Sequence, residues 1–262
     1  NGEYEDFEDT KFKAYRRKDV KKQLEKLFYK KCAYCEIKYK GSGDLQVEHF
    51  RPKKRLKVEI DENTKKTFTG YWWLSSSWMN LLPSCKKCNN KKLDFFPLSI
   101  SVNLISTPTE GSELVETSLL INPSEEEPSD YLHFTYQDDE SIVKSIGRAN
   151  TYRYLKGFNS IKYYDLMRED LVELRTENLK NFISCLLDIE YIFENIRISM
   201  LNNNLDEKVR HLNKLKFNVN RLFKDHLNVK KHQFIQPKTS FFTEWIQRLE
   251  PEEANQLLDL KD

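Results

Sequence analysis

Long apolar runs are missing from this chain of 262 residues. None approaches the roughly 20 residues that a bilayer-spanning helix needs. The acidic N-terminal residues show no signal-peptide pattern, and the sequence contains neither an internal repeat nor a long low-complexity segment. These absences exclude a membrane span and a repeat architecture, and they favour a cytoplasmic location. With 32% charged and 13% aromatic residues, the chain has a globular composition and enough length to bury a core.

Cysteine is also scarce, with five residues, but four of them form two pairs at the same spacing. The pairs are Cys32-x-x-Cys35 and Cys85-x-x-Cys88, whereas Cys185 stands alone. In a reducing compartment this spacing favours a metal over disulfides, which would be the better interpretation only for a secreted chain. Two such pairs complete a tetrahedral zinc site, and four thiolates leave no position open for water. We therefore expect a structural Zn²⁺; the alternative is four buried cysteines without metal.

The small net charge of +2 conceals an uneven distribution. Residues 11–100 carry a net charge of +14, residues 101–145 carry −9, and residues 146–262 are near neutral. The positive segment is the one that contains the cysteine pairs. A basic surface beside a metal site attracts phosphates, so nucleic acid is the expected ligand, although a charge run alone usually means a solvated face.

The apolar pattern predicts an α+β fold, with a small metal-binding domain followed by a mainly helical one. The predicted domains are 1–98, an acidic and β-rich connecting segment 99–145, and a helical domain 146–262. The elements expected up to residue 98 are a helix capped by Asp19, strands at 45–49 and 81–82, a hairpin over 56–68, and a helix from about Cys85 that ends before Pro97. Those expected later are strands at 117–121 and 131–136, helices over 161–193 and 205–228, and a last helix capped by Thr239-Ser240.

Glu48 and His49 lie between the two cysteine pairs, at the end of the first predicted strand. Histidine can take a proton from water near neutral pH, and a carboxylate is a suitable ligand for Mg²⁺ or Mn²⁺. Hydrolysis of a phosphodiester needs both functions. Successive side chains of a strand point to opposite faces, which would direct one toward a metal and the other toward water. Alone, such a pair is usually accidental, so the surrounding cysteines carry the prediction.

Two asparagines complete the predicted site. Asn80 is placed to bond backbone and fix the loop that follows His49, and Asn89 to offer a second metal ligand, with Asn90 as its competitor. Either asparagine is otherwise an ordinary cap or turn residue. The expected phosphate contacts are basic residues near the motifs, each of which is otherwise a solvated charge. They are Arg51, Lys53, Lys54, Arg55, Lys91 and Lys92.

These motifs resemble those of the HNH endonucleases, which have the ββα-metal fold. The matching pieces are Cys32-Ala-Tyr-Cys35, Val47-Glu-His-Phe-Arg-Pro-Lys53, Asn80-Leu-Leu and Cys85-x-x-Cys88-Asn-Asn-Lys-Lys92. The resemblance implies that His49 is the general base, that Glu48 and Asn89 bind the catalytic ion, and that Asn80 orients the loop. Glu48 and Asn89 stand where Asp and His are commoner in that family. Both are oxygen ligands, which favour Mg²⁺ or Mn²⁺.

More narrowly, the chain resembles the PtuB family, the HNH nucleases of Septu anti-phage systems that are also found with some retrons. That resemblance implies a PtuA-like ATPase partner of the ABC/SMC type in a hetero-oligomeric complex, with DNA the expected substrate ahead of RNA. The rival hypothesis is a catalytically silent, zinc-stapled module that binds nucleic acid or serves as an adaptor. In a third interpretation, compatible with the first, the helical region 146–262 docks the ATPase.

Overall fold

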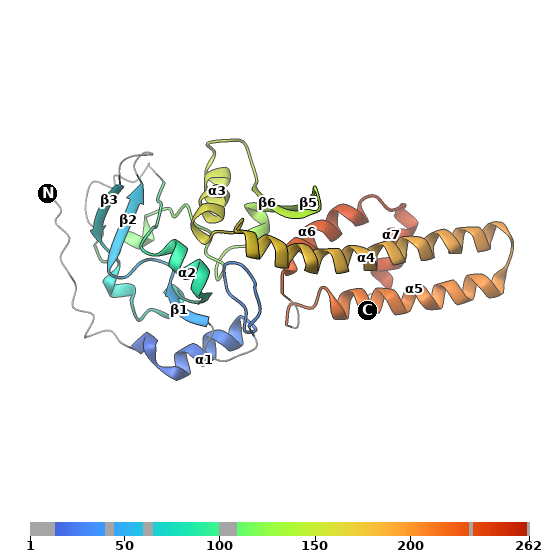
Figure 1. The fold of residues 1–262 in the computed structure, drawn as a ribbon, viewed down its shortest axis with the longest axis horizontal. Coiled ribbons are helices and arrows are strands. Elements are labelled where there is room, and N and C mark those ends of the chain that lie inside the picture. The colour runs from blue at the N-terminus through green and yellow to red at the C-terminus, as the bar shows by residue number, and fades with distance from the viewer. Residues whose placement is uncertain (1–13, 40–44, 60–64, 100–108, 231–232, 261–262) are drawn as a thin grey trace. The chain divides into compact units, whose positions relative to one another are not determined.

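Helices and three two-stranded sheets form the computed structural model, which describes residues 14–39, 45–59, 65–99, 109–230 and 233–260 (Figure 1). The chain divides into two compact units. The first comprises Asn1–His133 and Val143–Arg168, and the second comprises Phe134–Ile142 and Glu169–Asp262. Each unit is described by itself below.

Two antiparallel strands and the helix that follows them form the centre of the first unit. Strand β1 (Leu45–His49) pairs with β4 (Leu81–Cys85), so that Leu45 lies opposite Cys85 and His49 opposite Leu81. All five residues of β4 are buried. Helix α2 (Lys86–Lys92) starts directly after β4 and contacts both strands. The predicted strands and helix are therefore present, in the order strand, strand, helix.

The hairpin predicted over 56–68 is also present, as β2 (Arg55–Glu59) and β3 (Lys65–Thr69). Its buried side chains are Leu56, Val58 and Phe68, which alternate with exposed or half-buried positions. The hairpin lies between β1 and β4 in the sequence. An isolated β-bridge joins its residue Lys57 to Phe95, which follows α2.

Helix α1 (Lys18–Leu27) packs on β1 and β4. Its contact with the strands is a small cluster of Tyr15, Leu24 and Leu81, with Val20 and Val47 at the edge. The predicted N-cap, Asp19, is wrong: the cap position belongs to Arg17, and Asp19 lies in the first turn, where it pairs with Arg17. A 3₁₀ turn at Ala14–Arg16 leads directly into the helix, which therefore starts earlier in the chain than a cap at Asp19 would place it.

The acidic segment contains less regular structure than predicted. Short 3₁₀ turns occur at Ser112–Leu114 and Pro128–Asp130, and of the strand expected at 117–121 only an isolated bridge at Ser118 forms. The strand expected at 131–136 is confirmed as β5 (Leu132–Gln137). It pairs with an unpredicted strand, β6 (Glu140–Ser145).

Helix α3 (Tyr152–Tyr164) completes the first unit, and the side chain of Thr151 caps its first turn. Gly157 lets the helix approach the chain at Tyr131 and Ser145 closely. A Cβ atom at position 157 would lie 2.4 Å from the carbonyl oxygen of Tyr131. A larger residue there would therefore push α3 away from these residues.

The second unit is built on four helices, α4 (Glu169–Leu201), α5 (Leu205–Asp225), α6 (Ile235–Ile246) and α7 (Pro251–Asp259). Helices α4 and α5 run side by side as a long hairpin (Figure 1). Their shared core includes Phe182, Leu186, Leu215 and Leu222, and Trp245 of α6 joins it. The predicted cap Thr239-Ser240 is wrong, because both residues lie inside α6.

The two units divide the chain at positions other than the predicted domain limits at 98 and 145. The first unit also takes in α3, which the prediction assigned to the helical part. Independent folding of the predicted domains stays a prediction. Within the described ranges, every helix is either too short or too polar to cross a bilayer.

Candidate functional site

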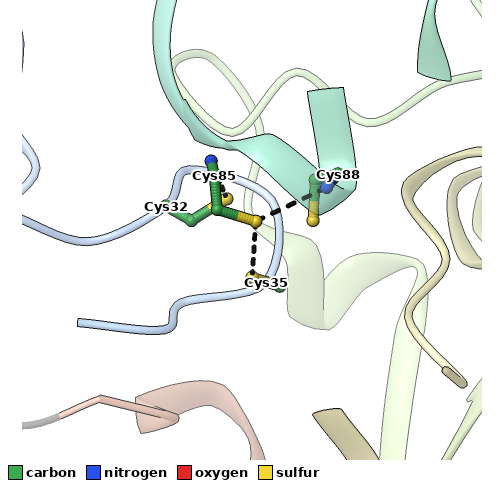
Figure 2. A group of neighbouring side chains, drawn as sticks. All are labelled: Cys32, Cys35, Cys85 and Cys88. Carbon is green, nitrogen blue, oxygen red and sulfur yellow. Dashed lines mark hydrogen bonds between the residues drawn. The ribbon is translucent and has the colours of Figure 1, made fainter. Parts of the chain in front are cut away.

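The four paired cysteines converge on one point of the first unit (Figure 2). Cys32 and Cys35 lie in the chain after α1, Cys85 ends β4, and Cys88 lies in the first turn of α2. All are buried, and their sulfur atoms lie within 4.8 Å of one another. The Sγ atoms of Cys35 and Cys85 are 3.9 Å apart. Tetrahedral zinc with Zn–S bonds of about 2.3 Å places two sulfurs about 3.8 Å apart, so the donors fit Zn²⁺.

Backbone contacts hold these cysteines in place. The N–H of Cys85 donates to Cys32 Sγ (3.3 Å), and the N–H of Cys88 donates to Cys85 Sγ (3.4 Å). The N–H of Ala33 donates to the carbonyl of Pro83 (2.8 Å), which docks the first pair against β4. N–H groups that point at sulfur favour the thiolate, the form that binds metal.

Arg168 adds a positive charge to the cysteine cluster. Its Nη1 contacts Cys88 Sγ at 3.5 Å, and its Nη2 contacts Cys35 Sγ at 3.6 Å. Burial alone would lower the pKa of Arg168, but the charges of Cys88 and Cys35 outweigh it and raise that pKa, so the guanidinium stays charged. Because four thiolates outweigh the charge of one Zn²⁺ ion, this cation would stabilise the cluster with zinc bound.

Glu48 and Lys92 form a buried ion pair between β1 and α2. Lys92 Nζ lies 2.8 Å from Glu48 Oε1 and donates to the carbonyl of His49 at 3.0 Å. Lys92 is 0% exposed and Glu48 is 6% exposed. Burial raises the pKa of Glu48, and the neighbouring ammonium acts in the opposite direction. The Lys92 ammonium is thus enclosed and bonded to β1, and its contact with phosphate stays a prediction.

Asn89 lies on the same side of α2 as Lys92. Its Nδ2 donates to Gln46 Oε1 at 2.7 Å, and Gln46 precedes Glu48 by two residues on the same face of β1. The interface of β1 and α2 thus gathers an amide and a carboxylate. Asn90 is exposed, whereas Asn89 is half-buried, which places the two competing asparagines in different environments.

His49 points away from this interface. Its Nε2 lies 2.9 Å from the carbonyl oxygen of Ser75, and its ring meets the ring of Tyr15 edge-on, with centroids 4.6 Å apart. A carbonyl only accepts hydrogen bonds, so the contact at Nε2 assigns the proton of the neutral ring to that nitrogen. Nδ1 is then the basic nitrogen.

Asn80 binds the loop that follows His49. Its Oδ1 accepts from the N–H of Arg51 (2.8 Å), and its Nδ2 donates to the carbonyls of Arg51 (3.0 Å) and Leu74 (3.3 Å). Gly70 presses on the same loop: a Cβ atom there would lie 2.4 Å from the carbonyl oxygen of Pro52. The backbone after β1 is thus held from two sides.

Arg51, a second predicted phosphate contact, has partners within the protein. Its Nη1 lies 2.8 Å from Glu116 Oε2, and its Nη2 donates to the carbonyls of Glu113 and Glu116. The guanidinium also lies over the rings of Tyr71 and Phe96. Arg51 is therefore committed to the acidic segment. Lys53 remains half-buried, with its ammonium 3.7 Å from the centre of the Tyr15 ring.

Sequence reasoning missed two residues of this site, Tyr15 and Arg168, and it named Lys92 only as a phosphate contact. Lys92 follows Cys88 by four residues, so a helix places both on one face, and this spacing was a usable signal. Tyr15 lies before the first predicted helix, and Arg168 lies 80 residues beyond Cys88. Neither of these two has a local pattern that points to the site.

Comparison with known proteins relates the chain to Septu proteins. It is 39% identical to Septu protein PtuB of Bacillus mycoides (strain KBAB4) over 176 residues, which cover 66% of this chain and 56% of that protein. It is 30% identical to Septu protein PtuB of Bacillus thuringiensis over 114 residues, which cover 43% of this chain and 32% of that protein.

A third similarity is to Septu protein PtuA of Bacillus mycoides, at 28% identity over 164 residues, 62% of this chain and 21% of that protein. No family model and no solved structure matches the chain. The chain thus spans about half the length, or less, of the curated relatives it matches. Over about two thirds of its own length, it is homologous to PtuB of the Septu systems.

Proposed function

We propose that this chain is the HNH nuclease component of an anti-phage defence complex. It hydrolyses phosphodiester bonds, and DNA is its expected substrate in preference to RNA. The observation that carries the proposal is the placement of the four motif residues. Glu48 and Asn89 share the interface of β1 and α2, His49 ends β1 on the other face, and Asn80 binds the loop after it. The cysteine cluster fixes the ends of β4 and α2 beside them.

His49 is the proposed general base. With its proton assigned to Nε2 by the carbonyl of Ser75, Nδ1 accepts the proton of the attacking water. Asn80 fixes the backbone after His49, which limits how far the ring can move. A positioned base of this kind contributes about 10²–10⁴ to the rate.

Glu48 and Asn89 would hold the catalytic Mg²⁺ or Mn²⁺, which supplies charge neutralisation at the phosphate. The donors fit, since a carboxylate and an amide oxygen are ligands of hard divalent ions. Lys92 already balances the charge of Glu48. Because the ion competes with this ammonium, we expect it to bind more weakly than it would at an unpaired carboxylate.

The comparisons support an association with a PtuA-like protein. A segment similar to this chain occupies 21% of a PtuA, so a related segment exists within a much longer Septu protein. We propose an ATPase of the ABC/SMC type as the partner of this chain, in a hetero-oligomeric complex. The helical second unit is the proposed docking surface.

Cleavage assays test the proposed activity. The chain and its His49→Ala variant are incubated alone and with the cognate ATPase, with Mg²⁺, Mn²⁺ or no added divalent ion. The substrates are plasmid, single-stranded DNA and total RNA. We expect divalent-dependent cutting that falls by at least about 10²-fold in His49→Ala. For the chain assayed alone, His211→Ala, which removes a histidine of α5, is the matched control and should cut normally.

Full activity in His49→Ala would rule out the proposed nuclease mechanism. The rival hypothesis, a silent binding module, rests on the same cysteine cluster and on the basic charge of residues 11–100. Binding of nucleic acid without cutting under every condition, with the ATPase present, would favour that module. The substrate that is cut decides between DNA and RNA.

A further inference from the structure

Helix α1 carries a concentration of positive charge that the predicted site did not use. Residues 16–31 contain eight lysines and arginines against two acidic residues, a net charge of +6. Lys18, Lys22 and Lys26 follow one another at four-residue steps, which places them on one side of the helix. All three are exposed.

This side of α1 faces away from the strands. The helix turns Val20 and Leu24 toward β1 and β4, and Leu24 is 2% exposed. A hollow of about 910 Å³ runs along the helix and is lined on the described part of the chain largely by lysine. These lysines are Lys18, Lys21, Lys22, Lys26 and Lys30.

Among the described residues, no ion pair or side-chain hydrogen bond involves the ammonium of Lys18, Lys22 or Lys26. By contrast, Arg51 forms an ion pair with Glu116, and Lys92 forms one with Glu48. The charges of Lys18, Lys22 and Lys26 are therefore available to an external anion.

The residue that contacts His49 lies just before the lysine row in the chain. Tyr15, whose ring contacts the imidazole, lies three residues before Lys18. The four-residue step along a helix is about 6 Å. Every second phosphate of one DNA strand lies about 6.8 Å further along the duplex axis, so the spacing of the lysines suits a row of phosphates on one strand.

We propose that Lys18, Lys22 and Lys26 of α1 bind the phosphodiester backbone of nucleic acid and guide it toward His49. The proposal rests on the proposed function for the identity of the ligand and for the role of His49. It does not require that the chain cut what it binds.

Binding measurements test this surface separately from cleavage. The background is His49→Ala without added divalent ion, so that bound DNA stays intact. The probes are a fluorescent 30-base-pair duplex and a 30-nucleotide single strand, each titrated over a range of salt concentrations. The test variant is Lys18→Gln/Lys22→Gln/Lys26→Gln. A charge-preserving variant replaces the same three lysines with arginine.

The control variant is Lys214→Gln/Lys216→Gln/Lys224→Gln, which removes the same charge from exposed positions of α5 in the second unit. We expect the α1 variant to bind duplex about tenfold or more weakly at 0.1 M salt, with the slope of log affinity against log salt smaller by roughly 2 to 3. The arginine and α5 variants should bind as the parent does. Zinc content and circular dichroism establish that all variants are folded.

Three results would overturn the assignment: an unchanged salt slope in the α1 variant, an equal loss in the α5 control, or no binding by the parent. Failure of the nuclease proposal would look different. If the chain binds through α1 but never cuts, the surface stands and only catalysis is lost. If it cuts while the α1 variant binds normally, the nuclease proposal stands and the α1 surface falls.

Discussion

At the scale of single residues, the basic side chains near the motif have two different uses. Lys92 and Arg51 each neutralise one buried carboxylate, that of Glu48 or Glu116. The lysines of α1 face outward. Sequence proximity to His49 therefore does not identify a phosphate contact, because a lysine's partner is decided by the side of the element on which it lies.

Removing the Lys92 ammonium should destabilise the protein. Lys92→Met leaves the Glu48 carboxylate buried without its partner, and we expect a loss of about 3–5 kcal/mol in the free energy of unfolding. The double variant Glu48→Gln/Lys92→Met removes both charges and should recover most of this loss. Urea unfolding of the three proteins measures the loss and its recovery. If Lys92→Met unfolds like the parent but binds DNA more weakly, Lys92 is a phosphate contact after all.

Arg168 should govern how tightly zinc is held. Arg168→Ala removes the cation beside Cys88 and Cys35, and we expect zinc affinity to fall by about 10–100-fold. Competition with a chromogenic chelator measures the affinity, and Arg168→Lys should recover part of it. Arg153→Ala, at an exposed position of α3, is the control. Identical zinc release from the parent and Arg168→Ala would show that the guanidinium contributes nothing to metal binding.

At the scale of the elements, Glu59 joins β2 to its neighbours. Its carboxylate pairs with Lys162 of α3 and Lys65 of β3 and accepts a hydrogen bond from Tyr163. Burial alone would raise the pKa of Glu59, but Lys162 and Tyr163 outweigh it and lower that pKa below its ordinary value of 4.5. The ionised carboxylate therefore stabilises the folded state.

The stabilisation by Glu59 should be complete above pH 4.5 and disappear as the pH falls through the lowered pKa of the folded state. We expect Glu59→Gln to lose about 0.5–1 kcal/mol at pH 7 and to approach the parent in acid. Urea unfolding at pH 7, 5 and 4 measures the difference between the two proteins. That difference is the useful quantity because acid also releases zinc from both. Glu110→Gln, at an exposed position, should show no such trend.

The elements that the sequence predicted best are those with a strong local pattern. Alternation predicted β1 and the β2–β3 hairpin, and the cysteine spacing predicted the cluster. β6 was missed because the acidic run before it was not recognised as a hairpin turn. Asp138 and Asp139 both have positive φ, as a tight two-residue hairpin turn requires, so the run is a turn.

The contacts of the site were harder to predict than its elements. Glu116 lies 65 residues from Arg51, so the pairing that withdraws Arg51 from the surface depends on the fold. Helix starts had a local signal that was overlooked. Pro237 lies in the first turn of α6, where proline is tolerated, and it indicates a start before Thr239-Ser240.

At the scale of the whole molecule, zinc should stabilise one unit and not the other. The cysteine cluster lies in the first unit, whereas α4–α7 have a hydrophobic core of their own. We expect zinc removal to reduce amide hydrogen-exchange protection in β1, β4 and α2, and to leave it unchanged in α4 and α5. Exchange measured by mass spectrometry with and without chelator tests this. A loss shared by α4 and α5 would show that the units unfold together.

The position of the cysteine pairs along the chain also affects the unfolded state. Cys35 and Cys85 are 50 residues apart, and the loop between them contains Glu48, His49 and Asn80. A cross-link that closes a loop of this length removes about 4 kcal/mol of chain entropy from the unfolded ensemble, by the relation used for disulfides. Zinc bound by both pairs would therefore restrict the conformations that the unfolded chain can adopt. It would confine these three residues to a small volume before any strand has paired.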